Sequence, residues 1–156
     1  MSKFGYRTID LLALGVRRET KAGASATPQP GMLAEINSGG RLIAHAVAGG
    51  IATSNWVTEQ DFTGSTIDTN YSASQLVQHS FIPAGGEVFA LLHTTQTIAI
   101  GNYLESAGNG RLREHVAATF AATTSAQVVI NRIVAQALEA ITNTTTAGIR
   151  IKVRVV

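Results

Sequence analysis

The chain has 156 residues, of which 45% are hydrophobic and only 14% are charged, well below the usual ~25% for soluble domains. It contains no cysteine, which excludes disulfides, thiolate catalysis and cysteine metal sites. No stretch has the length and apolarity of a signal peptide or a membrane span, and a net charge of +2 gives no support to nucleic-acid binding.

Residues 1–30 differ from the rest of the chain. Five Lys and Arg residues minus two carboxylates leave this segment at +3, so the remaining residues carry −1. Residues 21–30 are rich in Ala, Ser, Thr and Pro, which predicts a flexible linker. We therefore expect an N-terminal arm and linker at 1–30 ahead of a domain at 31–156, with the arm lying across a neighbouring subunit. The alternative is an N-terminal strand folded onto its own domain. The arm residues expected to make that contact are Phe4, Tyr6, Arg7, Ile9, Leu11, Leu12, Leu14, Arg17 and Arg18.

Two similar hairpins are predicted at residues 31–45 and 101–115. Six of their fifteen positions are identical without a gap, namely Gly31/Gly101, Glu35/Glu105, Gly40/Gly110, Arg41/Arg111, Leu42/Leu112 and His45/His115. Duplication and convergence on good hairpin chemistry explain this equally well. The chain is thus expected to be built around two related strand-turn-strand units.

The parity of the side chains predicts the turn of each hairpin. Placing Ile36 opposite Leu42 on the inward face requires an odd number of loop residues, and three fit well. A three-residue loop favours a positive φ at its last position, where Gly40 and Gly110 stand. In the second copy the residues expected to face inward are Ile98, Ile100, Leu104 and Leu112. Glu35 and Glu105 are then expected on the outer face, near Arg41 and Arg111.

Further strands are predicted around 54–58, 75–82 and 87–93, the last buried on both faces. Residues 128–141 fit a helical spacing of apolar residues and also fit a buried strand. At the end of the sequence, apolar residues alternate with Arg150, Lys152 and Arg154, which predicts a half-buried strand with one basic face. That face is either an ordinary solvated surface, the more common case, or a contact for an acidic partner.

No pattern typical of an enzyme or of a metal site is present. The four histidines His45, His79, His93 and His115 lack metal-ligand spacing, and no serine lies in a Gly-x-Ser-x-Gly elbow. None of the glycine pairs begins a phosphate loop. No cofactor is therefore expected. Trp56 and Tyr71 would favour sugar binding if they formed an exposed platform, and would not if Trp56 were buried.

The chain resembles the head decoration, or cement, proteins of tailed bacteriophages. The resemblance covers about 30–112 and 133–156, and it lies in the order of five degenerate pieces. They are 30–42 (Pro-Gly-Met-Leu-Ala-Glu-Ile-Asn-Ser-Gly-Gly-Arg-Leu), 83–88 (Pro-Ala-Gly-Gly-Glu-Val), 98–112 (Ile-Ala-Ile-Gly-Asn-Tyr-Leu-Glu-Ser-Ala-Gly-Asn-Gly-Arg-Leu), 134–140 (Val-Ala-Gln-Ala-Leu-Glu-Ala) and 149–155 (Ile-Arg-Ile-Lys-Val-Arg-Val). It implies a mainly β fold, with a single small β-barrel or tulip-like domain and an extended N-terminal arm. It also implies a strand, not a helix, at 133–140, preceded by a short helix.

The function expected from this resemblance is that of a non-enzymatic virion protein. Such proteins commonly form trimers on the outside of the capsid and clamp neighbouring major capsid subunits, so the expected partners are the major capsid protein and further copies of this chain. The low charged fraction agrees with a surface covered by other chains. We expect synthesis in the host cytoplasm and no binding to nucleic acid or membrane. The alternatives are a tail-tube or head–tail connector subunit, a carbohydrate- or host-surface-binding module, and a small barrel enzyme.

Overall fold

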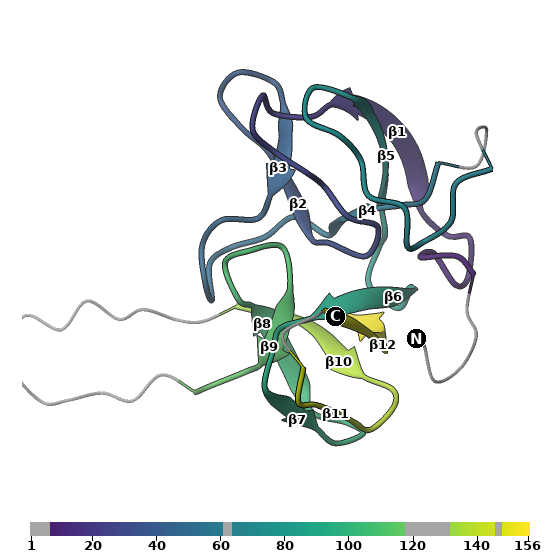
Figure 1. The fold of residues 1–156 in the computed structure, drawn as a ribbon. Coiled ribbons are helices and arrows are strands. Elements are labelled where there is room, and N and C mark those ends of the chain that lie inside the picture. Colours follow the sequence, from purple (N-terminus) through teal and green to yellow (C-terminus); the bar gives the residue numbers. More distant parts are fainter. Residues whose placement is uncertain (1–6, 61–63, 118–131, 146–147) are drawn as a thin grey trace, which may run out of the picture.

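A computed structural model describes residues 7–60, 64–117, 132–145 and 148–156. Within these residues the regular structure consists of β-strands, which Figure 1 shows in an upper and a lower group. In chain order the strands are β1 (Val16–Lys21), β2 (Ala34–Ile36), β3 (Leu42–Ala44), β4 (Asn55–Val57), β5 (Leu76–Phe81), β6 (Glu87–Leu92), β7 (Gln96–Ile98), β8 (Tyr103–Ser106), β9 (Leu112–Glu114), β10 (Ile133–Ala137), β11 (Ile141–Asn143) and β12 (Ile149–Val155).

The lower group contains a closed barrel in the order β10-β12-β6-β9-β8. β12 lies between β6 and β10, and its pairing with β6 runs from Ile149 opposite Leu92 to Arg154 opposite Glu87. β6 is buried on both faces except at Glu87, as predicted. Successive side chains of β12 alternate between the barrel interior and its outside, as the sequence pattern predicted. The expected mainly β fold with a small barrel is thus confirmed.

The upper group contains an antiparallel sheet in the order β1-β5-β4, beside the hairpin of β2 and β3. The largest apolar cluster joins this group to the barrel, since Leu33, Trp56 and Ile82 pack with residues of β6, β8 and β12. A smaller cluster fills the space between the upper sheet and the hairpin. Its members are Ala22, Ala34, Leu42, Val57, Tyr71 and Val77. Removal of this apolar surface from water holds the two groups together.

Both hairpins have the predicted three-residue loops. Ile36 pairs with Leu42 in the first, and Ser106 pairs with Leu112 in the second. One residue further on, the Asn37 N–H donates to the Arg41 carbonyl and the Ala107 N–H to the Arg111 carbonyl, which leaves 38–40 and 108–110 as the loops. Gly40 has φ of 68° and Gly110 has φ of 74°, which confirms the conformation expected of both glycines. In the first loop, the Asn37 side-chain oxygen accepts hydrogen bonds from the backbone N–H groups of positions 39 and 41, which reinforces the turn.

Three side-chain orientations predicted from parity are wrong. Ile36 is 49% exposed and Ile100 is 69% exposed, because the first ends its strand and the second lies in the turn beyond β7, where no second layer covers them. Glu105 was expected on an outer face with Arg111, but it is 0% exposed. Strand β10 pairs with β8 at this point, and Arg113 and His115 cover the carboxylate.

The conflict over residues 128–141 is resolved in favour of a strand where the structure describes them. β10 covers Ile133–Ala137, and a bend at 138–139 separates it from β11, so the predicted strand ends three residues earlier than expected. The bend is stabilised by a hydrogen bond from the Leu138 N–H to the Lys152 carbonyl. The short helix expected ahead of this strand falls mostly at 118–131, outside the described residues.

The expectation that the N-terminal segment packs little against its own domain is wrong for residues 7–20. All six residues of β1 pair with β5, from Val16 opposite Phe81 to Lys21 opposite Leu76. Ile9 is 0% exposed within the main core, and backbone hydrogen bonds join Ile9 to Phe89 and Leu11 to Glu87. The alternative of a strand folded onto its own domain therefore describes these residues. Phe4 and Tyr6 lie outside the described part of the chain.

Candidate interaction surface

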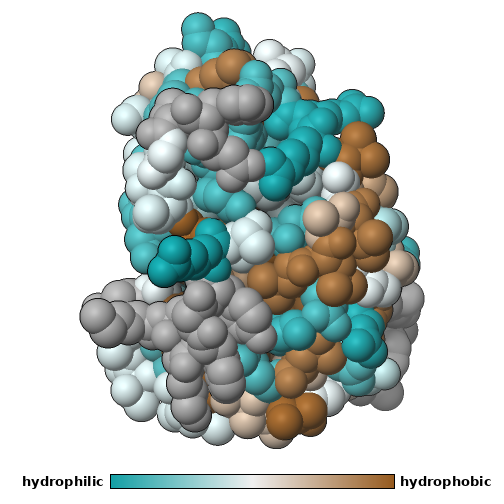
Figure 2. All heavy atoms as spheres, turned by 90° about the vertical axis from the view of Figure 1, so that its right-hand side faces the viewer, coloured by the Kyte–Doolittle hydropathy of each residue, from teal (hydrophilic) through white to brown (hydrophobic). Residues whose placement is uncertain are grey.

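A band of exposed apolar side chains runs from the loop before β1 onto the upper sheet. Leu12, Leu14 and Val16 are 47%, 53% and 58% exposed, and Phe81, opposite Val16 on β5, is 48% exposed. We call these four residues the apolar band. β1 and the loop that precedes it lie on the right of Figure 1, and Figure 2, which faces that side, shows apolar side chains gathered across the right half of the surface. Contiguous exposed apolar surface is typical of a contact with another macromolecule.

The loop that presents Leu12 and Leu14 is held at both ends. On one side Ile9 donates its N–H to Glu59 and lies in the core, and on the other the Gly15 N–H donates to the Asp10 carboxylate over 2.8 Å. A Cβ on Gly15 would approach that carboxylate to 2.6 Å and the Ser80 Cβ to 2.8 Å, so this position requires glycine. The backbone is therefore fixed where the two leucines project, which lowers the entropy cost of binding through them.

The structure separates the residues that the sequence grouped as one binding arm. Ile9 lies in the core, and Leu11 packs partly against it. Leu12 and Leu14 are exposed, as are Arg7, Arg17 and Arg18. Sequence reasoning missed Phe81, and alternation gives no signal for it, since Phe81 shares its face of β5 with the buried Val77 and His79.

The shared Glu and His positions of the two hairpins contact each other in both copies. His115 Nδ1 lies 2.9 Å from Glu105 Oε2, and Arg113 binds the other oxygen of that buried carboxylate at 2.7 Å. In the first hairpin, His45 Nε2 lies 3.7 Å from Glu35 and donates to the Ile51 carbonyl at 3.0 Å. His45 Nδ1 then accepts from the Ser106 hydroxyl at 2.7 Å, which links one hairpin to the other. Both members of that last pair are at most 1% exposed, so they serve the contact between the hairpins.

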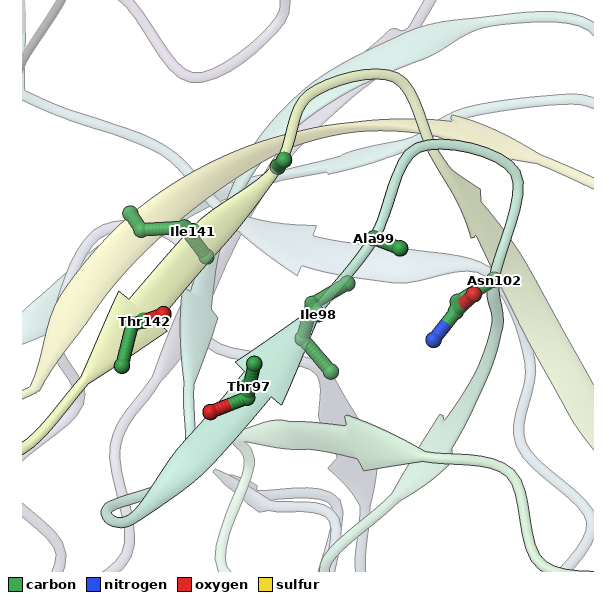
Figure 3. Close-up of a pocket in the computed structure, with 7 residues that line it drawn as sticks. Thr97, Ile98, Ala99, Asn102, Ile141 and Thr142 are labelled. Carbon is green, nitrogen blue, oxygen red and sulfur yellow. The ribbon is translucent and has the colours of Figure 1, made fainter.

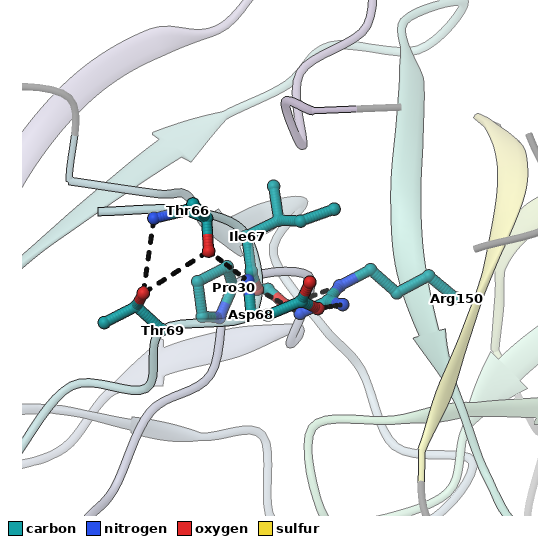
Figure 4. Close-up of polar contacts among 6 residues, drawn as sticks. All are labelled: Pro30, Thr66, Ile67, Asp68, Thr69 and Arg150. Carbon is teal, nitrogen blue, oxygen red and sulfur yellow. Dashed lines mark hydrogen bonds and ion pairs between the residues drawn. The ribbon is translucent and has the colours of Figure 1, made fainter. Parts of the chain in front are cut away.

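Arg150, which belongs to the predicted basic face, forms hydrogen bonds with other residues of the same chain (Figure 4). Its guanidinium donates to the Pro30 carbonyl at 3.0 and 3.2 Å, to the Ile67 carbonyl, and to the Asp68 carboxylate at 2.8 Å. Since Pro30 and Ile67 belong to the upper part of the chain, Arg150 joins that part to barrel strand β12. This arrangement leaves Arg150 engaged in internal contacts.

Lys152 and Arg154 both contact Glu87 on the neighbouring strand, at 2.7 and 3.4 Å. The hydrogen bond from Lys152 lowers the pKa of Glu87 below its ordinary value, with a smaller contribution from Arg154. Arg150, Lys152 and Arg154 thus all have carboxylate partners within the chain. This favours an ordinary strand surface over a binding site for an acidic partner.

A shallow hollow of about 630 Å³ lies where β7 and β11 meet, outside the barrel (Figure 3). Its lining consists of small or aliphatic side chains and Asn102, without a charged group. Its residues are Thr97, Ile98, Ala99, Asn102, Ala140, Ile141 and Thr142. The hollow therefore offers apolar contact but few groups that would orient a polar ligand.

Metal sites, membrane spans and sugar-binding platforms find no support in the described part of the chain. The described residues contain no group of three or more potential ligands that would hold a metal ion, and no helix long and apolar enough to cross a membrane. Trp56 is 0% exposed and Tyr71 is 4% exposed, so these two aromatics do not form the exposed platform that sugar binding would favour.

The fold is similar to that of a solved structure from a phage head. It matches the head fiber gp8.5 N base in bacteriophage phi29 with a TM-score of 0.51, at 14% identity, over 90% of this chain and 95% of that chain. No family model matches the sequence, and no curated protein matches it significantly. At this identity the likeness is one of fold.

Proposed function

We propose that this protein is a structural component of a tailed-phage head, which binds the outside of the capsid and stabilises the lattice of the major capsid protein. The observation that carries the proposal is the fold shared with a phage head fiber base over 90% of this chain. The apolar band and the low charged fraction of 14% support a surface that another protein covers. The proposal assigns no catalytic role.

Binding stabilises a capsid by mass action. A protein that binds only the assembled lattice favours that lattice by an amount that grows with its free concentration relative to Kd. Burying one large apolar side chain contributes about 1.5–3 kcal/mol relative to full exposure. Leu12, Leu14, Val16 and Phe81 already have about half of their surface covered, so each contributes a part of that amount. Two of these side chains project from the fixed loop and two from the ends of β1 and β5, and their combined burial supports a specific attachment.

Capsid binding through the apolar band is tested with the variant Leu12→Ser/Leu14→Ser. Both side chains project from the loop, so we expect the melting temperature to stay nearly unchanged while affinity for undecorated capsids falls tenfold or more. Ile100→Ser is the matched control, because Ile100 is 69% exposed and lies in the turn after β7. Unchanged capsid affinity of the double variant would exclude the band as the attachment surface.

Deleting residues 1–20 is a poorer test of the same idea. The deletion removes Ile9 from the core and most of β1 from its sheet, so the shortened protein is expected to lose stability whether or not the segment binds a capsid.

We further propose that the protein acts as a homotrimer. A trimer seated where several capsid subunits meet would gain from multivalency, because each attached copy holds the others at high effective concentration. Light scattering of the purified protein, together with imaging of decorated particles, measures this directly. A monomer in solution combined with single isolated copies on particles would contradict it.

Cryo-electron microscopy of particles distinguishes this proposal from its rivals. Density on the outer face of the capsid supports it, whereas density in the tail or at the portal would identify a tail-tube or connector subunit. Absence from particles, together with binding to a glycan array, would identify a host-surface-binding module.

A further inference from the structure

A second depression, of about 340 Å³, lies beside β1, β2 and β5 in the upper part of the molecule. Three of the side chains that line it are apolar and about half exposed: Val16 at 58%, Ile36 at 49% and Phe81 at 48%. The other four are polar. They are Arg18, Thr53, Asn55 and His79.

His79 and Asn55 form a rigid polar floor. The carboxamide oxygen of Asn55 accepts from His79 Nδ1 at 2.7 Å, so Nε2 of the neutral ring accepts from the Thr20 hydroxyl at 2.8 Å. Burial lowers the pKa of His79, and the nearby Arg18 charge lowers it further, so the ring is neutral at pH 7. Arg18 lies directly across from His79 in the pairing of β1 with β5.

Two donors at this depression lack partners within the described part of the chain. Asn55 is only 8% exposed and its oxygen is bound to His79, but its Nδ2 has no acceptor. The Arg18 guanidinium likewise has no carboxylate or carbonyl partner there. Arg18 is also the one formally charged group among the residues that line the depression, since His79 is neutral. The site therefore offers positive charge and N–H donors beside apolar walls.

We propose that this depression binds a segment of a partner protein in which an Asp or Glu side chain adjoins an apolar side chain. A guanidinium is suited to a carboxylate, because its N–H groups form paired charge-assisted hydrogen bonds with it, and the Asn55 amide adds a third donor. Val16, Ile36 and Phe81 cover the neighbouring apolar side chain. A basic segment is repelled by Arg18, and a purely apolar one leaves Asn55 and Arg18 without acceptors. The depression shares Val16 and Phe81 with the apolar band, but the inference does not depend on the proposed function, since peptide binding is measured without capsids.

The probes are two N-acetylated, C-amidated pentapeptides, Ala-Leu-Glu-Leu-Ala and the same peptide with Gln in place of Glu. They are titrated into ¹⁵N-labelled full-length protein at pH 7. We expect chemical-shift changes centred on Val16, Arg18, Asn55 and Phe81, including the side-chain amide of Asn55. The Glu peptide should bind about tenfold more tightly than the Gln peptide, which is the difference a charge-assisted contact supplies.

Variants assign that preference to named groups. Arg18→Gln should abolish the difference between the peptides, while Arg17→Gln, one position along β1 and on its opposite face, should preserve it. Ile36→Ser should weaken both peptides equally. Thermal melts of each variant establish that the fold is retained.

Three outcomes of the peptide titrations would overturn the inference. They are equal affinity for the two peptides, a Glu preference that survives Arg18→Gln, and shift changes that fall elsewhere on the protein. Acetate and inorganic phosphate are titrated alongside. If either reproduces the shifts with the affinity of the Glu peptide, the site is a general anion site and the assignment to a partner segment fails.

Discussion

Gly40 and Gly110 adopt the same left-handed backbone conformation at the ends of two similar loops, but only Gly110 is packed against another part of the chain. A Cβ on Gly40 would meet nothing within 4 Å. A Cβ on Gly110 would lie 3.1 Å from the Leu33 carbonyl and 3.1 Å from the Ala44 Cβ. The second hairpin thus packs its tip against the first, whereas residues 38–40 at the tip of the first are exposed.

We predict that Gly40→Val destabilises the protein by about 1 kcal/mol or more, through the strain of a β-branched residue at positive φ. Gly110→Val carries the same strain and also overpacks the contact with the first hairpin, which adds about 1–3 kcal/mol. Urea unfolding monitored by circular dichroism measures both. Equal losses for the two variants would mean that the Gly110 loop is not packed as described.

Arg150→Met is predicted to lower the free energy of unfolding by about 2–3 kcal/mol. The substitution removes a guanidinium that is 11% exposed and leaves the carbonyls of Pro30 and Ile67 without their donor. Arg154→Met is the control, because Arg154 is 48% exposed and its ion pair with Glu87 is expected to contribute at most about 1 kcal/mol. Chemical denaturation of both variants gives the comparison, and similar losses would contradict a joining role for Arg150.

The lowered pKa of His79 makes stability depend on pH. Between the unfolded pKa near 6.5 and the lower folded value, the unfolded chain binds more protons, so the free energy of unfolding falls as the pH drops below 6.5. Above that range both states carry a neutral ring and the effect vanishes. In the variant His79→Gln, the free energy of unfolding should therefore fall less between pH 6.5 and the folded pKa of His79 than it does in the wild-type protein. The measurement is urea unfolding of both proteins from pH 7.5 to 5, and parallel curves would exclude a role for His79.

Glu87 acts in the same direction at lower pH. Its folded pKa lies below 4.5 because Lys152 donates to it, so its contribution is complete above 4.5 and is lost as the pH falls through the folded value. Glu87→Gln should therefore reduce the loss of stability below pH 4.5 and leave the slope near pH 6 unchanged. Thermal melts at pH 3, 4 and 6 test this, and an equal acid sensitivity of the variant would contradict it.

Trp56 provides a direct reporter of the core. It is the only tryptophan, it is 0% exposed, and its indole N–H donates to Ser54 at 3.0 Å. We predict blue-shifted emission and protection from acrylamide in the folded protein, both lost on unfolding. Trp56→Ala should cost about 3–5 kcal/mol. Strong acrylamide quenching under native conditions would show that the side chain is accessible.

The two hairpins and β12 could be predicted from the sequence, because apolar alternation and the placement of glycines depend on neighbouring residues alone. β1 could not be predicted in this way, since five of the six residues in Val16–Lys21 are polar or charged and give no apolar alternation. A charged strand at a sheet edge is common, because charge there prevents pairing with other chains. The partner of such a strand depends on tertiary contacts that no local pattern contains.

The candidate surface was predictable only in part. An apolar run at 9–16 indicated a contact segment, but periodicity could not separate the core residue Ile9 from the exposed Leu12 and Leu14, since a loop intervenes. The depression beside Arg18 draws its lining from four separate stretches of the chain. Only the pairing of β1 and β4 with β5 brings Arg18 and Asn55 together around His79.

Of the five barrel strands, β12 comes last in the sequence, and this affects when the barrel can close during translation. β12 closes the barrel between β6 and β10, and its Arg150 reaches back to Pro30 across a separation of 120 residues. On the ribosome, β6 must therefore wait with an open edge and an apolar face until residues 149–155 have emerged. Such a chain completes its fold late and benefits from chaperones that shield the open edge, and truncation before residue 149 should yield an aggregating product.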